Sequence, residues 1–295
     1  GVALGSTVQL ATPNCGLTLG TWTATDSDEH DGSLSKWLLL SDEARAAAAP
    51  PARALLLAKH EQLSASESST YETFRPREKP LLSALQRQRC VRFLDLLWAE
   101  ASAEDEGEGV SHRDRYDLKV ALKDRGAMRA LLGQQEDGDA EFNATAVSDI
   151  LSFDLGQQPA MVLRCTRGPV PGAIGFHTTS GMCSDAGRVL QLALVDDSTY
   201  EGGRLCFFTP ALGLHVPERR AGFLSIHSPG VMHAVTRLTR GTQYSLFAFG
   251  GAKGCDDKHV MEVSEEDVLR IMAPPTSTRT TRSMWSSPPT TEPTT

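Results

Sequence analysis

The sequence predicts an α+β protein in which helices precede an all-β barrel or sandwich. Two observations support this prediction. Between residues 41 and 132, apolar side chains recur at helical spacing, and from Ala160 onward short β-rich runs alternate with Gly and Pro turns. Strands of this length and spacing are typical of barrels and sandwiches. We expect the helices to pack on the outside of the barrel as supporting elements.

Several stretches show signals for a helix. Ser41-Asp42-Glu43 predicts the cap of a short helix that ends at Pro50-Pro51, and a second helix is expected over Ala52–Leu63 because proline is tolerated in the first turn. The strongest signal covers Pro80–Glu100, where apolar residues are spaced three and four apart. These residues include Leu82, Leu85, Phe93, Leu94, Leu97 and Trp98.

Further along, Tyr116–Leu132 predicts an amphipathic helix ending near Gly133. Residues 145–153 fit a helix or a strand equally well. Ser264 starts a brief helix that reaches Met272. Residues 1–35 suggest loops or short strands, and residues 64–79 suggest a polar linker. The tail after Pro274 is rich in Pro, Thr and Ser and cannot bury a core, so we expect disorder there.

The β-rich part contains seven runs that we expect to be strands. They are Ala160–Cys165, Ala173–His177, Arg188–Val195, Arg204–Phe208, Gly222–His227, Val231–Leu238 and Tyr244–Phe249. Gly202-Gly203 favours a tight turn before one of these strands over a phosphate-binding loop, since no helix of the required pattern follows it.

The composition excludes some classes of function. The net charge of −8 and the pI near 5.5 argue against a nucleic-acid or anionic-membrane binder, because such partners select basic surfaces. The six cysteines are scattered without a C-x-x-C pair, which favours free thiols in a reducing compartment. We expect a soluble protein and favour the cytoplasm, but the first residue is Gly, so a preceding segment with a targeting signal is left open.

An ordered set of motifs points to a family. It runs from the segment ending Gly175-Phe176-His177, through Tyr200-Glu201-Gly202-Gly203-Arg204 and the segment around His227, to His233-Ala234-Val235 and Gly241-Thr242-Gln243-Tyr244-Ser245. This set resembles the prolyl 4-hydroxylase-like branch of the iron(II)/2-oxoglutarate dioxygenases over about residues 158–250. The resemblance implies a double-stranded β-helix, a jelly-roll or cupin-like barrel, with N-terminal helices packed on it.

The pattern along the chain, together with the resemblance over about residues 158–250, predicts a domain layout. An irregular segment with short helices would cover residues 1–78, and a helical support region residues 79–157. The dioxygenase-like domain would cover residues 158–252. A short C-terminal helix would lie within residues 253–273, followed by a disordered tail over residues 274–295.

By resemblance, the chain would use Fe(II), 2-oxoglutarate and ascorbate to hydroxylate a peptidyl or small-molecule substrate. Such a site binds iron through two imidazoles and a carboxylate on one face of the metal. His177 and His233 match the imidazole positions. The carboxylate position, two residues after the first histidine, is Thr179, a weak neutral ligand. Asp185 in the following loop is a possible substitute with unlike spacing.

The cosubstrate position departs from the family as well. Ten residues after the second histidine, the family has a basic residue that binds the far carboxylate of 2-oxoglutarate, whereas this chain has Gln243. Ser245 retains the hydroxyl found two residues later. Arg237 shares strand parity with His233 and is expected to face inward, while Arg240 is expected at the surface.

For other polar residues, a structural role explains the sequence at least as well as a functional role does. His227 is expected to be structural or to contact the site, and His215 to lie in a surface loop. Gln191 lies in an apolar strand, so we expect it to point into the barrel and to need a partner.

Two functions remain open from the sequence. One is an active dioxygenase, and the other is a catalytically degenerate protein that keeps the barrel for binding or as a scaffold. A cupin-like sugar- or metal-binding protein accounts less well for the ordered motifs.

Overall fold

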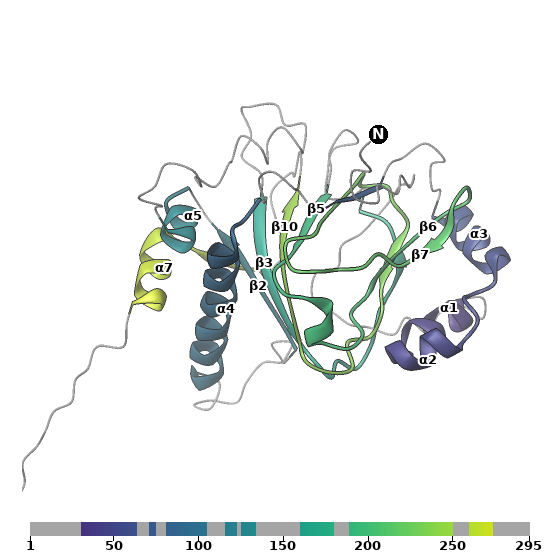
Figure 1. The fold of residues 1–295 in the computed structure, drawn as a ribbon, viewed down its shortest axis with the longest axis horizontal. Helices are drawn as coiled ribbons and strands as arrows, with labels where there is room; N and C mark the ends of the chain where they lie inside the picture. The colour runs from purple at the N-terminus through teal and green to yellow at the C-terminus, as the bar shows by residue number, and fades with distance from the viewer. Residues whose placement is uncertain are drawn as a thin grey trace, which may run out of the picture.

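The structure is a computed structural model that describes residues 31–63, 71–74, 81–104, 116–122, 125–133, 160–179, 189–249 and 260–273. Two sheets lie at the centre of the molecule, with helices on both sides (Figure 1). None of the helices in these ranges is long and apolar enough to span a bilayer.

The larger sheet has seven strands in the order β1-β8-β5-β10-β3-β2-β11. Its neighbouring strands are antiparallel except for β11 and β2, which are parallel. The strands are β1 (Tyr71–Phe74), β2 (Asp117–Leu122), β3 (Ala160–Arg167), β5 (Val189–Ala193), β8 (Leu224–His227), β10 (Thr242–Phe249) and β11 (Val260–Val263).

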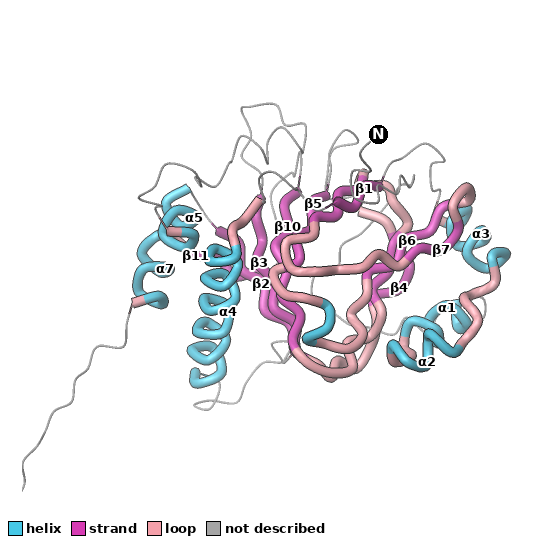
Figure 2. Tube along the Cα trace, in the orientation of Figure 1, coloured by secondary structure: helices cyan, strands magenta, loops and turns pink. Residues whose placement is uncertain are grey.

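The smaller sheet has four antiparallel strands in the order β4-β9-β6-β7. These are β4 (Ile174–His177), β6 (Leu205–Thr209), β7 (Gly213–His215) and β9 (His233–Val235). From β3 to β10 the chain passes repeatedly between the two sheets, which is how a jelly roll is wound. The expected α+β fold with a double-stranded β-helix is therefore confirmed, and Figure 2 shows its strands around the centre of the molecule.

The outer face of the larger sheet is apolar because alternate residues of a strand point to the same side. Leu190, Leu192 and Leu246 share one core with Phe93 and Leu94 of the long helix. Three helices cover this face (Figure 1). They are α4 (Ala84–Glu104), α5 (Arg125–Leu132) and α7 (Glu265–Met272).

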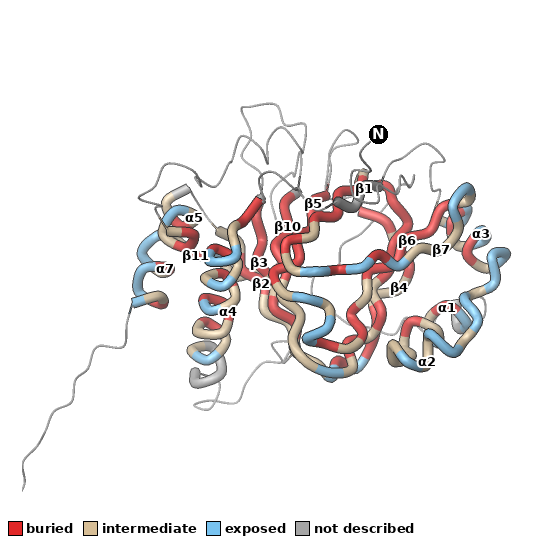
Figure 3. Tube along the Cα trace, in the orientation of Figure 1, coloured by how far each residue is buried: buried red, intermediate tan, exposed pale blue. Residues whose placement is uncertain are grey.

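The inner face of the larger sheet is polar, although it is buried. Strand register places Gln191 opposite both Ser225 and Phe247, and Ser245 lies two residues before Phe247 on the same side. Gln191, Ser225 and Ser245 are each less than 8% exposed, in line with the buried strands in Figure 3. Buried polar side chains need hydrogen-bond partners, and a bound ligand can supply them. We therefore looked for a functional site on this face.

The outer face of the smaller sheet forms a second core. Phe176 and Phe208 pack there with Leu34, Leu38 and Leu56. These leucines come from α1 (Asp31–Leu38) and α3 (Arg53–Gln62). The N-terminal helices thus lie on the opposite side of the barrel from α4, α5 and α7, as Figure 1 shows.

A short helix, α2 (Asp42–Ala47), fixes the turn before β6. The Asp42 carboxylate accepts hydrogen bonds from the backbone N–H of Gly202, at 2.8 Å, and from Nε of Arg204, at 3.2 Å. Gly202 and Gly203 have φ angles of +77° and +62°, which glycine adopts without strain. The predicted tight turn is confirmed.

Most sequence-based helix predictions are confirmed. The Ser41 hydroxyl caps α2 by accepting the N–H of Ala44, and Ser264 with Asp267 forms a capping box at α7. α3 and α4 fall within a few residues of the expected ranges. The described strands β3, β4, β5, β6, β8, β9 and β10 overlap the seven expected runs.

The prediction of a single helix over Tyr116–Leu132 is wrong. Its first half is β2, and helix α5 starts only at Arg125. Leu118 and Val120 are apolar and alternate with Lys119, so this stretch fits a period of two as well as a helical period. Pairing with β3 and β11 on either side selects the strand. The expected helical support region therefore also contributes to the sheet.

Two further strands at the sheet edges, one strand in an expected loop and one α-helix were not predicted. α1 begins at Asp31, within a stretch expected to be loops or short strands, and β1 lies in the expected linker. β7 contains His215, which was expected in a loop, and β11 precedes α7. Short strands such as β1 and β11 have weak patterns of their own and form because a sheet edge offers backbone partners.

Three cysteines lie within the described residues. Cys90, Cys165 and Cys206 are free and buried, and burial raises the pKa of each thiol to about 12. They fit the expected free thiols, and a buried thiol with a raised pKa is unreactive. The other three cysteines, residues 145–153 and the tail after Pro274 lie outside the described residues.

Candidate functional site

Three histidines meet on the inner side of the barrel. His177 ends β4 and pairs in register with His233 of β9, so their ring centroids are 4.3 Å apart. His227, at the end of β8 in the other sheet, has its ring centroid 4.8 Å from that of His233. The Phe207 ring lies against His227 and His233. The predicted pairing of His177 and His233 is thus present in the fold, and His227 joins them.

Each ring has a backbone carbonyl beside its Nδ1 atom. The distances are 2.7 Å from His177 to Gly175 O, 2.9 Å from His227 to Ser228 O and 2.6 Å from His233 to Val231 O. A carbonyl oxygen can only accept, so Nδ1 carries the proton in each ring. In the neutral ring, Nε2 then keeps its lone pair, which is the form that binds a metal or accepts a hydrogen bond.

Burial keeps these rings neutral. Desolvation lowers the pKa of His227 to about 4. Desolvation, followed by the neighbouring His177 and His227, lowers the pKa of His233 well below its usual value. The pKa of His177 is also lowered by desolvation. At neutral pH the cluster therefore carries no charge and presents imidazole nitrogens as acceptors.

Thr179 stands where the resemblance places a carboxylate ligand. It is fully buried, and both its backbone N–H and its hydroxyl donate to the carbonyl oxygen of Pro229, at 2.6 Å and 3.0 Å. The hydroxyl is therefore engaged with the backbone. Asp185, the proposed substitute, lies outside the described residues.

The ligand set for iron is incomplete in the described part of the chain. Two imidazoles are present at the expected positions, but a carboxylate to join them is not found there. Although the rings of His177, His227 and His233 lie close together, no three His, Cys, Asp or Glu side chains of the described ranges are arranged so that they could hold a metal ion. These residues therefore do not fit the two-histidine, one-carboxylate site of an iron oxygenase.

Gln243 stands at the position of the cosubstrate-binding base. Its amide nitrogen donates to the carbonyl oxygen of Gly203 at 2.9 Å and lies 3.4 Å from the Tyr200 hydroxyl. The amide thus holds the turn before β6.

The two arginines near Gln243 in sequence face different surroundings. Arg240 is exposed, as predicted. The backbone N–H of Arg237 donates to Leu38 O in α1, and its Nε is buried without a hydrogen-bond partner.

Ser245 has a charged partner that the sequence did not suggest. Nη2 of Arg219 lies 3.2 Å from Oγ of Ser245, and Nη1 lies 2.9 Å from Oε1 of Gln191. All three side chains are buried, with Arg219 only 3% exposed. Gln191 does point inward and does have a partner, as expected. The guanidinium therefore lies on the inner face of the larger sheet.

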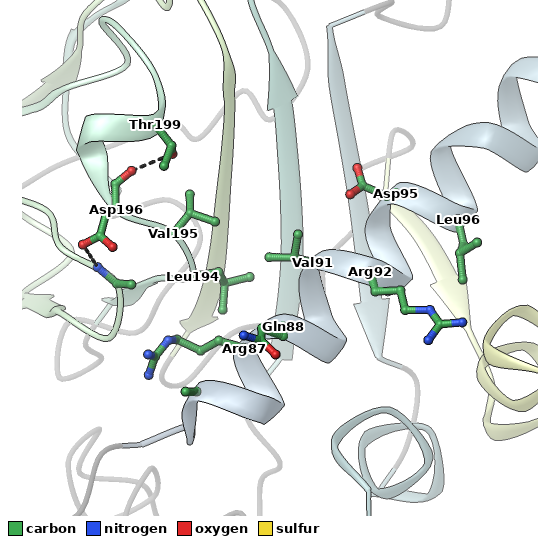
Figure 4. Close-up of a pocket in the computed structure, with 12 residues that line it drawn as sticks. Arg87, Gln88, Val91, Arg92, Asp95, Leu96, Leu194, Val195, Asp196 and Thr199 are labelled. Atoms are coloured by element: carbon green, nitrogen blue, oxygen red, sulfur yellow. Dashed lines mark hydrogen bonds between the residues drawn. The ribbon is translucent and has the colours of Figure 1, made fainter.

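The backbone of Arg219 is fixed by the segment that follows β5. Its N–H donates to the Asp197 carboxylate at 3.0 Å, and its carbonyl oxygen accepts the N–H of Asp197 at 2.9 Å. The neighbouring Asp196 carboxylate accepts the N–H of Ala221 at 3.0 Å (Figure 4). The two adjacent aspartates thus hold the loop that carries Arg219 in one position.

A second charged group lies beside Ser245 on β2 and β3. Arg164 is in register with Ser245, and its guanidinium makes two hydrogen bonds of 2.8 Å to the Asp117 carboxylate. Lys119 lies 3.4 Å from the same carboxylate. Burial would raise the pKa of Asp117, but Arg164, Lys119 and Thr166 together outweigh burial, so the pKa is lowered and Asp117 stays charged. This carboxylate anchors Arg164 in place.

A groove of about 580 Å³ lies elsewhere, on the outer side of the larger sheet (Figure 4). It is lined by residues of α4 such as Val91 and Asp95, and by Leu194, Val195 and Asp196. The histidines do not contribute to its lining.

The structure matches solved 2-oxoglutarate/Fe(II) oxygenases over most of their chains. AviO1 from Streptomyces viridochromogenes Tue57 aligns with 70% of this chain and 98% of its own, at 15% identity and a TM-score of 0.44. A Pseudomonas putida prolyl-4-hydroxylase aligns with 67% of this chain and 99% of its own, at 18% identity and a TM-score of 0.38.

An oxidoreductase of the 2OG-Fe(II) oxygenase family from Burkholderia pseudomallei aligns with 62% of this chain and 96% of its own, at 12% identity and a TM-score of 0.35. No family model and no curated protein matches the chain.

Proposed function

We propose that this chain is a binding protein built on the dioxygenase fold, whose barrel holds a small polar ligand without oxidising it. The observation that carries the proposal is the state of Thr179, whose hydroxyl donates to Pro229 O at the position of the missing carboxylate. A neutral hydroxyl supplies no negative charge, and an iron site of this type takes a carboxylate as its third protein ligand.

The engagement of Gln243 supports the same proposal. Its amide is turned to Gly203 O, so the position that would carry a cosubstrate-binding cation acts on the turn instead. The chain thus lacks both the carboxylate ligand, at Thr179, and the cosubstrate-binding base, at Gln243. The loss of both groups favours loss of turnover. The polar inner face, by contrast, remains intact: the three histidines, Gln191 and Ser245 are in place and hydrogen-bonded.

The second candidate is an active dioxygenase that hydroxylates a peptidyl or small-molecule substrate. The observation in its favour is the hydrogen bonding of His177 and His233, because Nδ1 bonded to a carbonyl leaves Nε2 in the form that binds metals. In that case His177 and His233 would hold the iron and Ser245 would contact the cosubstrate. The third iron ligand would have to come from outside the described residues, where Asp185 lies.

Metal content and turnover separate the two candidates. Purified protein is incubated anaerobically with Fe(II) and desalted, its iron is measured, and succinate formation from 2-oxoglutarate is followed after oxygen is admitted. We expect substoichiometric iron and succinate no higher than that of a His177→Ala/His233→Ala control. One iron per chain, together with succinate formation that this control lacks, would establish the dioxygenase and refute the binding protein.

A further inference from the structure

We propose that two copies of this chain associate through strand β7, with the two β7 strands lying side by side and antiparallel. This association goes beyond the binding function of the barrel and does not depend on it. Among the strands that the structure describes, β7 pairs only with β6, so it forms one edge of the smaller sheet (Figure 2). Such an edge presents backbone N–H and C=O groups that a further strand can pair with.

Exposed apolar side chains gather around this edge. Leu212 directly precedes β7 and Val216 directly follows it, and these side chains are 54% and 39% exposed. Leu57 of α3 is exposed as well, so this region holds three of the five large apolar side chains that are exposed within the described ranges. Single exposed apolar residues are normal, but a group of them marks a surface for association. We call Leu57, Leu212 and Val216 the edge patch.

Helix α3 holds the hairpin between β6 and β7 in place. Nη2 of Arg53 donates to the carbonyl oxygen of Pro210 in the turn of this hairpin. Leu57 follows Arg53 by four residues, and residues at this spacing share one face of a helix. Leu214, at the centre of β7, packs against the core beneath. The edge patch is therefore formed before a partner arrives, which lowers the entropic cost of association.

A second copy suits this edge because the apolar residues lie symmetrically about Leu214. In an antiparallel pair with a twofold axis beside Leu214, Leu212 of each copy lies near Val216 of the partner copy. The two exposed side chains of one copy thus cover the two of the other. A contact of this kind uses the same surface on both copies, so it ends at a dimer.

The charges at the two ends of β7 are complementary in this arrangement. Arg53 lies at the turn before β7, and Glu218 follows Val216 by two residues at the other end. Antiparallel pairing brings the turn of one copy beside the opposite end of the other, so Arg53 of each copy approaches Glu218 of the partner copy. Glu218 already pairs with Arg220 of its own chain, and a carboxylate has lone pairs enough to accept a second cation. Matched end charges and a symmetric patch favour a second copy over an unrelated extended peptide.

The size of the surface limits the strength of the dimer. β7 is three residues long, so pairing of the two strands adds few backbone hydrogen bonds. The edge patch therefore contributes most of the binding, and small interfaces of this kind associate weakly. We expect a dissociation constant in the micromolar range. The exposed charges add little to the affinity, but they select the antiparallel orientation, because a parallel pair would bring like charges together.

Sedimentation velocity of the full chain over a range of concentrations tests the dimer. We expect the wild type to shift from monomer to dimer as its concentration rises through the micromolar range. Leu212→Asp and Val216→Asp should each weaken dimerisation by about tenfold or more, because the symmetry places the new charge in the apolar contact twice. Leu85→Asp is the matched control, since Leu85 is an equally exposed type of side chain on α4, away from β7, and its replacement should leave dimerisation unchanged.

Charge reversal tests the antiparallel orientation. Arg53→Glu and Glu218→Arg should each weaken the dimer, and the two together should restore much of the affinity, because the reversed charges match again. Circular dichroism confirms that each variant is folded. A wild type that stays monomeric at every concentration overturns the proposal, and so does a dimer that Leu212→Asp and Val216→Asp leave unchanged. Single reversals without effect, or a double reversal that restores nothing, would rule out the antiparallel pair.

Discussion

The hydroxyl of Thr179 and its backbone N–H share one acceptor, the carbonyl oxygen of Pro229. This relationship predicts the effect of removing the hydroxyl. Thr179→Val keeps the shape of the side chain, and Pro229 O keeps the backbone donor at 2.6 Å. We expect a loss of about 1 kcal/mol in the free energy of unfolding, measured in urea, because one hydrogen bond is lost without leaving its acceptor bare. A loss above roughly 3 kcal/mol would show that the hydroxyl has a further buried partner.

Replacing Thr179 and Gln243 by the residues that the family has at these positions should restore binding of the metal ion and of 2-oxoglutarate. Thr179→Asp places a carboxylate two residues after His177, and we expect it to raise Fe(II) or Mn(II) affinity at least tenfold. Adding Gln243→Arg should then create or raise turnover of 2-oxoglutarate. The neutral isostere Thr179→Asn is the control for the metal effect. Equal metal affinity in the Asp and Asn variants, or a wild type that turns over as fast as the double variant, would contradict our interpretation of both positions.

The turn before β6 should tolerate no side chain at Gly202. A Cβ atom there would lie 1.8 Å from the carbonyl oxygen of Arg237, and φ is +77°. We expect Gly202→Ala to reduce stability by several kcal/mol or to prevent folding. Gly213→Ala is the control, because φ is +75° there but the Cβ meets nothing within 4 Å. Its loss should stay near 1–2 kcal/mol, the cost of the left-handed backbone. Similar melting temperatures for both variants would contradict the clash.

The link from α2 to the barrel should be measurable through Asp42. Asp42→Asn removes the charge that accepts from Gly202 and Arg204. The side chain is 26% exposed, so solvent moderates the effect, and we expect a loss of about 1 kcal/mol in urea unfolding. The exposed neighbour Glu43 provides the control Glu43→Gln, which should change stability by less than about 0.5 kcal/mol. Equal effects of the two substitutions would mean that Asp42 does not hold the turn.

Stability should fall as the pH is lowered through the histidine range. Burial lowers the pKa of His227 to about 4, below its usual value of 6.5, so the unfolded chain binds more protons than the folded chain between these values. The stability that the neutral His227 side chain contributes is therefore fully present above pH 6.5 and is lost progressively toward pH 4. Urea unfolding at pH 7, 6 and 5.5 in the presence of a chelator should show this slope, and His227→Gln should flatten it. A slope unchanged by that substitution would assign the pH effect to other groups.

Much of the fold could be predicted from the sequence because its signals are local. Capping residues such as Ser41 and Ser264, and the alternation of apolar residues in the β-rich runs, depend on neighbours close in the chain. Tyr116–Leu132 could not be assigned in this way. Its apolar spacing fits two periods, and the edge of β3 decided between them.

The candidate site, too, could be predicted from the sequence only in part. The order of the motifs in the sequence was enough to identify His177, His233, Thr179, Gln243 and Ser245 as the positions to examine. It did not reveal what their side chains contact, because Pro229 and Gly203 approach Thr179 and Gln243 only in the folded chain. Arg219 and Arg220 are adjacent and chemically identical in the sequence. Tertiary structure alone buries the first against Ser245 and exposes the second, since burial depends on segments far apart in the chain.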